Sequence, residues 1–215
     1  MRLPSPLYAI LDRSVAGGRD LPDLLEAVLS GGCRLVQLRE KTLPPTDLFP
    51  LAQRLVRRCR EVGAWLIVND RADLAVACEA HGLHVGQEDL PARQARAILK
   101  PGMILGVSTH DPEQARRAVA DGADYVAVGS IFPTTTKAGF QLVGPELIRR
   151  VRPEVPVPLV GIGGITPENA AEVLGAGADA VAVISALCAA PDPEAATRLF
   201  LARIARPADG ARAGQ

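Results

Sequence analysis

The most regular feature of the chain is a succession of short apolar runs, each of which ends at a glycine or a polar residue. Most residues inside these runs are aliphatic, and many are β-branched. Near-continuous apolar character of this kind is typical of parallel β-strands that are buried on both faces. The pattern predicts eight strands, within residues 7–12, 34–40, 64–70, 82–87, 103–109, 124–130, 157–164 and 180–186.

Segments with helical periodicity separate these runs, because their apolar residues recur every three or four positions. One such stripe consists of Leu48, Leu51, Leu55, Cys59 and Val62. A second lies within residues 21–29 and should end at the two glycines that follow it. Asp111 before Pro112, and Thr166 before Pro167, each predict a helix start with an N-cap residue and a proline in the first turn.

Two of the predicted strands also resemble each other. Residues 123–130 (ADYVAVGS) and 178–185 (ADAVAVIS) agree at six of eight positions and lie 55 residues apart. That separation is two strand–helix units of about 27 residues, which is the unit length expected if the whole chain forms eight such units. We therefore predict an α/β fold, a single-domain (β/α)8 TIM barrel over residues 1–205, with 206–215 as a mobile tail. An open doubly wound sheet is the alternative.

Charge and cysteine content narrow the function classes. The 24 basic and 24 acidic residues give a net charge of zero, which argues against a nucleic-acid-binding or membrane-surface protein. The N-terminus has no long apolar run and does not resemble a signal peptide, and no stretch approaches the length of a membrane span. The four cysteines are far apart and form no CxxC pair, so we expect reduced, buried cysteines in a cytoplasmic protein. The oligomeric state is open, and a homo-oligomer is compatible with the sequence.

In a TIM barrel the catalytic groups lie at the carboxyl ends of the strands. After the seventh and eighth predicted strands come GIGGITPEN (161–169) and VISAL (183–187). Their backbone amides and two helix N-termini would form an anion site of the kind that binds phosphate in such barrels. Tight packing at a strand–helix turn is the alternative explanation for the glycines.

Two carboxylates follow neighbouring strands, at Asp70 and Asp89. Without a histidine or cysteine cluster beside them, they suit a hard cation such as Mg²⁺, although each could instead cap a helix. Only three of the 24 basic residues are lysines. Two of these, Lys41 and Lys137, lie in loops that follow predicted strands, and the second closes an unusual PTTTK segment (133–137). Acids and cations together indicate a site for a diphosphate with a metal ion.

Several motifs at these strand ends resemble those of thiamine-phosphate synthase: QLREK (37–41), VND (68–70), HVGQED (84–89), GVSTH (106–110), FPTTTK (132–137), GIGGI (161–165) and VAVIS (181–185). The resemblance extends from about Leu7 to Phe200. That family joins an aminopyrimidine methyl diphosphate to a thiazole phosphate, and releases diphosphate. The resemblance implies that this chain binds two small-molecule substrates and Mg²⁺.

The resemblance also implies roles for individual residues. The pyrimidine diphosphate would be bound by Gln37, Leu38, Arg39, Glu40, Lys41, Asn69, Ser108 and Lys137. The thiazole phosphate would be bound by Thr134, Thr135, Thr136, Gly164, Ile184 and Ser185. Mg²⁺ would be held by Asp70 and Asp89. No residue would act as a nucleophile, so Arg39, Lys41 and Lys137 would contribute electrostatically.

Two other functions are compatible with the same barrel. A thiazole tautomerase of a related branch would bind a thiazole phosphate without coupling it, and His110 could be its acid–base residue. A non-catalytic phosphate-binding barrel would use the same anion site as a sensor or assembly partner. The complete set Arg39, Lys41, Asp70, Asp89 and Lys137 argues against the tautomerase, whereas the net charge of zero and the polar rim are compatible with the non-catalytic barrel.

Overall fold

The structure is a computed structural model and describes residues 1–134 and 143–205. Eight parallel strands pair in chain order, and β8 pairs with β1, so the sheet is a closed barrel. The predicted (β/α)8 fold is thus confirmed, and the open sheet is excluded. The strands are β1 Leu7–Asp12, β2 Leu35–Arg39, β3 Trp65–Asn69, β4 Gly82–Val85, β5 Ile104–Thr109, β6 Tyr125–Val128, β7 Leu159–Ile162 and β8 Ala180–Val183.

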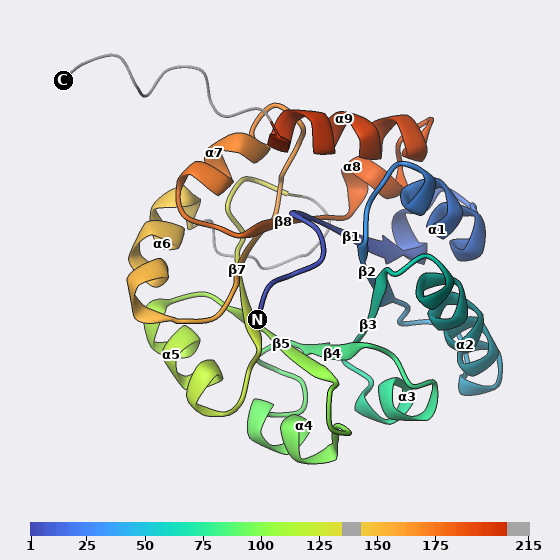
Figure 1. Cartoon of the computed structure of the whole chain (residues 1–215), viewed down its shortest axis with the longest axis horizontal. Helices are drawn as coiled ribbons and strands as arrows, with labels where there is room; N and C mark the ends of the chain where they lie inside the picture. Colours follow the sequence, from blue (N-terminus) through green and yellow to red (C-terminus); the bar gives the residue numbers. More distant parts are fainter. Residues whose placement is uncertain (135–142, 206–215) are drawn as a thin grey trace.

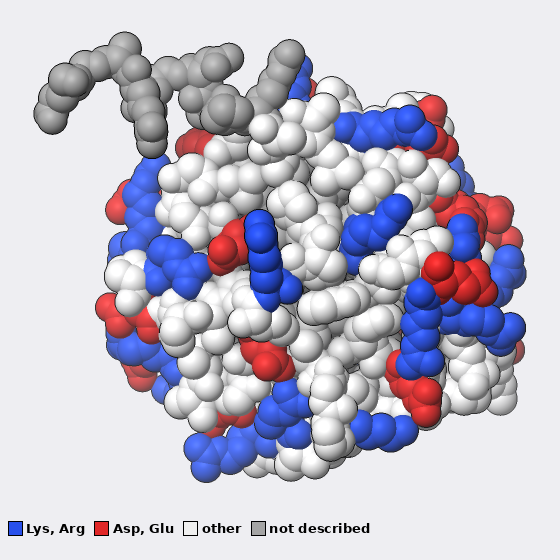
Figure 2. Space-filling view, viewed as in Figure 1, with Lys and Arg blue, Asp and Glu red and all other residues white. Residues whose placement is uncertain are grey.

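Helices surround the barrel as an outer ring (Figure 1). They are α1 Leu21–Ser30, α2 Pro45–Glu61, α3 Ala72–Ala77, α4 Ala92–Ile98, α5 Pro112–Ala120, α6 Gly144–Val151, α7 Ala170–Gly175, α8 Ser185–Cys188 and α9 Pro193–Ala205, with short 3-10 helices at Arg13–Val15 and Arg152–Glu154. Basic and acidic residues are mixed around the edge of the face in Figure 2. Within the described part of the chain, no helix is both long and apolar enough to cross a membrane.

The core has two layers, which explains why the strands are apolar on both faces. Alternate strand residues point outward and pack beneath the helices in a large cluster. The others fill the barrel interior: Tyr8, Ile10, Leu35, Ile67, Ile104, Tyr125, Ala127, Val160, Ala180 and Ala182. The barrel is therefore a packed body with its functional surface at one end.

The helix predictions are mostly confirmed. In α2 the buried stripe contains Leu48, Leu55 and Cys59, and α1 ends at Ser30 before two glycines. The Asp111 side chain caps α5 by accepting a hydrogen bond from the backbone N–H of Gln114 at 2.8 Å. All four cysteines are free and buried.

The helix start predicted at Thr166 and Pro167 is wrong, because α7 begins only at Ala170. The side chain of Asn169 accepts a hydrogen bond from the N–H of Thr166 and donates one to the carbonyl of Gly164. These two bonds hold a turn between β7 and α7. A threonine followed by proline suits such a turn as well as it suits a helix start.

Some predictions lie outside the described residues. Thr135, Thr136 and Lys137 belong to residues 135–142, and the expected tail is 206–215. Their roles, the division of the chain at residue 205, the cytoplasmic location and a homo-oligomer all stay predictions.

Candidate active site

A cavity of about 840 Å³ opens at the carboxyl ends of the barrel strands. Its lining combines residues that terminate β2, β3, β5 and β8 with residues from the loops after β4, β6 and β7. Eleven of the predicted site residues line it: Gln37, Arg39, Lys41, Asn69, Asp70, Asp89, Ser108, Thr134, Gly164, Ile184 and Ser185. One end of one barrel thus gathers residues that are up to 148 positions apart in the sequence, from Gln37 to Ser185.

Two residues predicted from the QLREK motif do not bring their side chains to this cavity. Leu38 points outward and is buried in the layer beneath the helices. One carboxylate oxygen of Glu40 accepts hydrogen bonds from Thr42 and from the N–H of Leu43. Although burial opposes ionisation, these bonds lower the pKa of Glu40. The carboxylate therefore shapes the loop after β2, and strand alternation explains why Leu38 faces away from Gln37 and Arg39.

Arg39 is held at the mouth of the barrel by Asp12. Their strands pair in a register that sets Asp12 directly opposite Arg39, and the two side chains form an ion pair. The Asp12 carboxylate also accepts hydrogen bonds from the N–H and hydroxyl of Ser14 at 2.9 and 2.6 Å. Since Asp12 is only 2% exposed, it fixes the guanidinium more firmly than a surface partner would.

The two predicted metal ligands lie close together beside a lysine. The ammonium of Lys41 is 3.3 Å from the Asp70 carboxylate. Burial, together with the neighbouring Asp89 carboxylate, raises the pKa of Asp70, and Lys41 partly offsets this increase. Neither aspartate side chain caps the following helix. Instead, Asp89 accepts a hydrogen bond from the N–H of Gly86 at 2.8 Å.

This donor set fits a magnesium ion. Two carboxylates whose mutual repulsion raises a pKa would both be stabilised by a divalent cation between them. Among residues 1–134 and 143–205, no group of three or more His, Cys, Asp or Glu could hold a metal ion. A Mg²⁺ ion at this pair would thus take most of its ligands from water and substrate phosphate, as is usual for this ion.

The end of β7 has the backbone freedom that the glycine motif predicted. Gly163 and Gly164 both have positive φ angles, 102° and 63°. A Cβ at Gly164 would lie 2.4 Å from the carbonyl oxygen of Pro133, so close packing alone requires glycine there. Gly164 is therefore tightly packed and also lines the cavity.

The prediction of two helix N-termini at the cavity is wrong for one of them. Residues of α7 do not line the cavity, because the turn described above separates that helix from β7. Ser185 is the first residue of α8 and does line the cavity, directly after β8. The anion site expected here would thus depend on α8 and on the loop backbone.

Comparison with known proteins identifies the family. A sequence model described as thiamine monophosphate synthase matches residues 7–187. The chain belongs to the thiamine monophosphate synthase family. It is 50% identical to the thiamine-phosphate synthase of Moorella thermoacetica over 194 residues, covering 89% of this chain and 92% of that protein. The corresponding enzyme of Roseiflexus sp. (strain RS-1) is also 50% identical, over 97% of this chain and 89% of its own length.

A solved structure of this family supports the assignment. The thiamine phosphate pyrophosphorylase of Pyrococcus furiosus superposes with a TM-score of 0.84 at 37% identity, covering 92% of this chain and 94% of that one. The resemblance drawn from the sequence motifs is thus confirmed.

The family motifs did not point to every residue of the site. Asp12 is the last residue of the first predicted strand (7–12), and its pairing with Arg39 was not predicted. His84 is buried, lines the cavity and forms a hydrogen bond with Ser108. Tyr8 and Tyr125 extend that contact into the barrel, and in the sequence both look like ordinary core residues.

Proposed function

We propose that this chain is a thiamine-phosphate synthase, an enzyme of thiamine biosynthesis. It couples 4-amino-5-hydroxymethyl-2-methylpyrimidine diphosphate with 4-methyl-5-(2-hydroxyethyl)thiazole phosphate, and it releases thiamine phosphate and diphosphate. The observation that carries this proposal is 50% identity to enzymes of that name over nearly the whole chain. The cavity supports it, because it gathers two acids, Arg39 and Lys41 at one end of the barrel.

The reaction breaks the bond between the pyrimidine methylene carbon and a diphosphate oxygen. The thiazole nitrogen then donates its electron pair to that carbon. Both electrons of the broken bond leave with the diphosphate, so negative charge develops on the departing group. Such a reaction needs stabilised charge and aligned rings more than it needs a protein nucleophile.

The cationic side chains suit this requirement. Arg39, oriented by Asp12, can donate parallel hydrogen bonds to phosphate oxygens, and Lys41 adds a compact charge beside Asp70. In this proposal the pyrimidine diphosphate occupies the side of the cavity formed by β2 to β5, where Gln37, Arg39, Lys41, Asn69 and Ser108 lie. Leu38 and Glu40 would contribute through backbone and loop shape. Lys137 would complete this set from its loop.

The thiazole phosphate would occupy the opposite side, after β6, β7 and β8. Thr134, Gly164, Ile184 and Ser185 line the cavity there. The neighbouring Thr135 and Thr136 would add two hydroxyl groups. Mg²⁺ would be held by Asp70 and Asp89, and when bound it would neutralise charge on the leaving diphosphate.

The test is a coupling assay with purified protein, both substrates and Mg²⁺. We expect thiamine phosphate and diphosphate to appear in equal amounts, and we expect omission of Mg²⁺ to abolish the reaction. A parallel sample with only a non-aromatic thiazole isomer tests for the tautomerase, because His110 lines the same cavity. Isomerisation without coupling would replace the proposal by the tautomerase, and binding without either reaction would replace it by a sensor.

A further inference from the structure

A chain of hydrogen bonds crosses the barrel beneath the cavity. The amide nitrogen of Gln37 donates to the Tyr8 hydroxyl at 2.7 Å, and the Tyr8 and Tyr125 hydroxyl oxygens are 2.9 Å apart. The Tyr125 hydroxyl is 2.9 Å from Nδ1 of His84, whose Nε2 is 2.8 Å from the Ser108 hydroxyl. Gln37 and Ser108, the two ends of this series of hydrogen bonds, line the cavity. The two tyrosines between them are almost fully buried.

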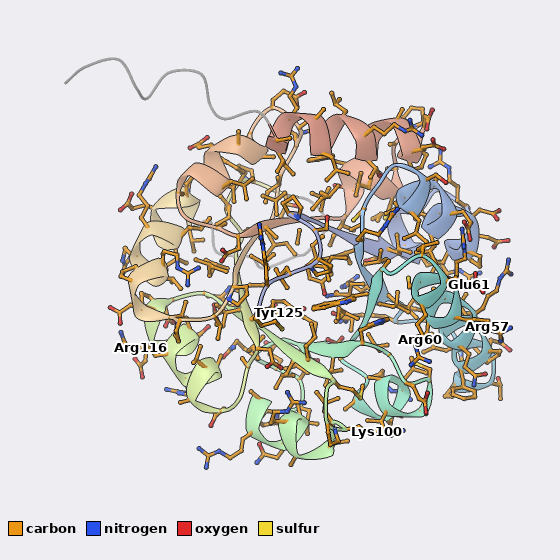
Figure 3. The ribbon with its side chains drawn as sticks, viewed as in Figure 1. Arg57, Arg60, Glu61, Lys100, Arg116 and Tyr125 are labelled. Atoms are coloured by element: carbon orange, nitrogen blue, oxygen red, sulfur yellow. The ribbon has the colours of Figure 1, made fainter. Side chains whose placement is uncertain are left out.

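The strand register and a glycine allow these side chains to approach one another. Gly106 on β5 pairs with His84 on β4 and with Tyr125 on β6. A Cβ at Gly106 would lie 2.0 Å from the ring of Tyr125, so only glycine lets that ring lie across β5 toward His84. The centroids of the Tyr125 and His84 rings are 5.6 Å apart, and Figure 3 labels Tyr125 near the middle of the ring of strands.

The chemistry of the groups sets the direction of the hydrogen bonds. An amide nitrogen can only donate, so the Tyr8 oxygen accepts from Gln37 and its hydrogen goes to Tyr125. The hydrogen of Tyr125 then goes to Nδ1 of His84. With the opposite direction, the Tyr8 hydrogen would have no acceptor among the partners found in the described residues.

The protonation states agree with this direction. An imidazole with one accepting nitrogen is neutral, so the His84 ring carries a single proton. Since Nδ1 accepts from Tyr125, that proton is on Nε2 and is donated to Ser108. Burial raises the pKa of Tyr8 and of Tyr125, so both phenols keep their hydrogens.

We propose that Tyr8 and Tyr125 are positioning residues that fix the tautomer of His84, and thereby determine which group at the cavity donates and which accepts. Ser108 accepts from His84 and therefore offers its own hydrogen to the substrate. Gln37 is bound through its nitrogen, so its carbonyl oxygen offers an acceptor. A donor on β5 and an acceptor on β2 match a ring that carries both an acceptor nitrogen and an amino group, as a 4-aminopyrimidine does. This inference rests on the proposed function for its substrate.

The tautomer can be observed directly in the full chain labelled with nitrogen-15 histidine. Long-range nitrogen–proton correlations distinguish a proton on Nε2 from one on Nδ1, and His84→Gln assigns the signal. We expect the Nε2–H form in the wild type and a mixture of the two forms in Tyr125→Phe, which lacks the donor to Nδ1. An Nδ1–H form in the wild type, or an unchanged tautomer in Tyr125→Phe, would overturn the proposal.

Steady-state kinetics test whether this series of hydrogen bonds affects substrate binding. Loss of one directed hydrogen bond at a buried site should raise the KM for the pyrimidine diphosphate in Tyr125→Phe about tenfold. The KM for the thiazole phosphate should stay within about twofold, because in this proposal that ligand does not contact the hydrogen-bonded residues Gln37 and Ser108. Tyr8→Phe, which acts at the Gln37 end, should show the same asymmetry and replaces Tyr125→Phe if that variant does not fold.

Substitutions of His84 test separately the two hydrogen bonds that its ring forms, one at Nδ1 and one at Nε2. Glutamine can place a donor near the Nε2 position and so supply Ser108, whereas asparagine can place an acceptor only near Nδ1. We therefore expect His84→Gln to keep a lower KM for the pyrimidine diphosphate than His84→Asn. The reverse order, or equal values, would contradict the role assigned to Ser108.

A matched control comes from a buried hydroxyl far from the cavity. Thr197 in α9 donates to the carbonyl of Pro193 at 2.7 Å, and Thr197→Val removes that bond without altering the barrel interior. It should leave both KM values unchanged. If the wild type produces no thiamine phosphate, the proposed function fails and the labelled histidine still tests the tautomer. If the wild type couples its substrates and Tyr125→Phe behaves like Thr197→Val, only the positioning role fails.

Discussion

The ion pair between Asp12 and Arg39 allows a quantitative test of how Arg39 is held at the cavity. Asp12→Asn keeps an acceptor for Ser14 but removes the charge that faces Arg39. The Asp12 side chain is 3% exposed and that of Arg39 is 23% exposed. Breaking a fully buried pair costs about 3–5 kcal/mol. Because Arg39 opens toward the cavity and can be hydrated there, we expect the unfolding free energy to fall by only about 2 kcal/mol.

The effect on activity should be larger than a stability loss alone would produce. If Arg39 loses its fixed orientation, about one charge-assisted hydrogen bond to the diphosphate is lost, which is worth roughly 1.5–3 kcal/mol. That corresponds to a decrease of about 10- to 150-fold in kcat/KM for the pyrimidine diphosphate. Urea unfolding curves and steady-state kinetics on the same preparation measure both quantities.

Ser14→Ala is the control for this variant. It removes a hydroxyl that donates to the same carboxylate at 2.6 Å but leaves the charge on Asp12 in place. We expect a modest loss of stability and nearly normal kinetics. Should Asp12→Asn be destabilised while kcat/KM stays within twofold of the wild type, the idea that Asp12 orients Arg39 for the reaction would be refuted.

Three further predictions follow from the site and the core. Asp89→Asn keeps an acceptor for the N–H of Gly86 but removes one carboxylate charge, so the Mg²⁺ concentration for half-maximal activity should rise at least tenfold; an unchanged magnesium titration would exclude Asp89 as a ligand. Ser185→Ala should raise the KM for the thiazole phosphate about tenfold and change that for the pyrimidine diphosphate less, so equal effects would contradict the division of the cavity. Burial lowers the pKa of His81, whose Nδ1 accepts from the N–H of Leu66. As the pH falls below about 6.5, His81 is therefore protonated in the unfolded protein before it is protonated in the folded protein, which lowers stability. Unfolding free energies measured between pH 8 and 5 should fall less steeply in His81→Gln than in the wild type.

The barrel was predictable because its strands have a strong and repeated signal. Residues 157–164 and 180–186, for example, contain the observed strands β7 and β8, since burial on both faces leaves little room for polar residues. The start of α7 was not predictable in the same way. Whether Thr166 caps a helix or enters a turn depends on the side chain of Asn169, and that contact is decided by the tertiary structure.

The site was predictable wherever topology alone brings residues together. Asp70 and Asp89 follow adjacent strands, so a barrel places them at the same rim. The pairing of Asp12 with Arg39 additionally required the strand register, which apolar runs of uncertain length do not define. The role proposed for Tyr125 required a further fact, that its ring occupies the volume beside Gly106, and a sequence does not show which core residues pack against each other.

That shared volume has a consequence for recombination between relatives. His84, Gly106 and Tyr125 belong to three consecutive strands and occupy paired positions. A chimera that takes β5 from a parent with a larger residue at position 106 would drive that side chain into the Tyr125 ring. A parent with a smaller residue at position 125 would instead leave a hole in the barrel. We expect strands β4 to β6 to be exchangeable only as one block, so crossover points that yield folded chimeras should lie before β4 or after β6.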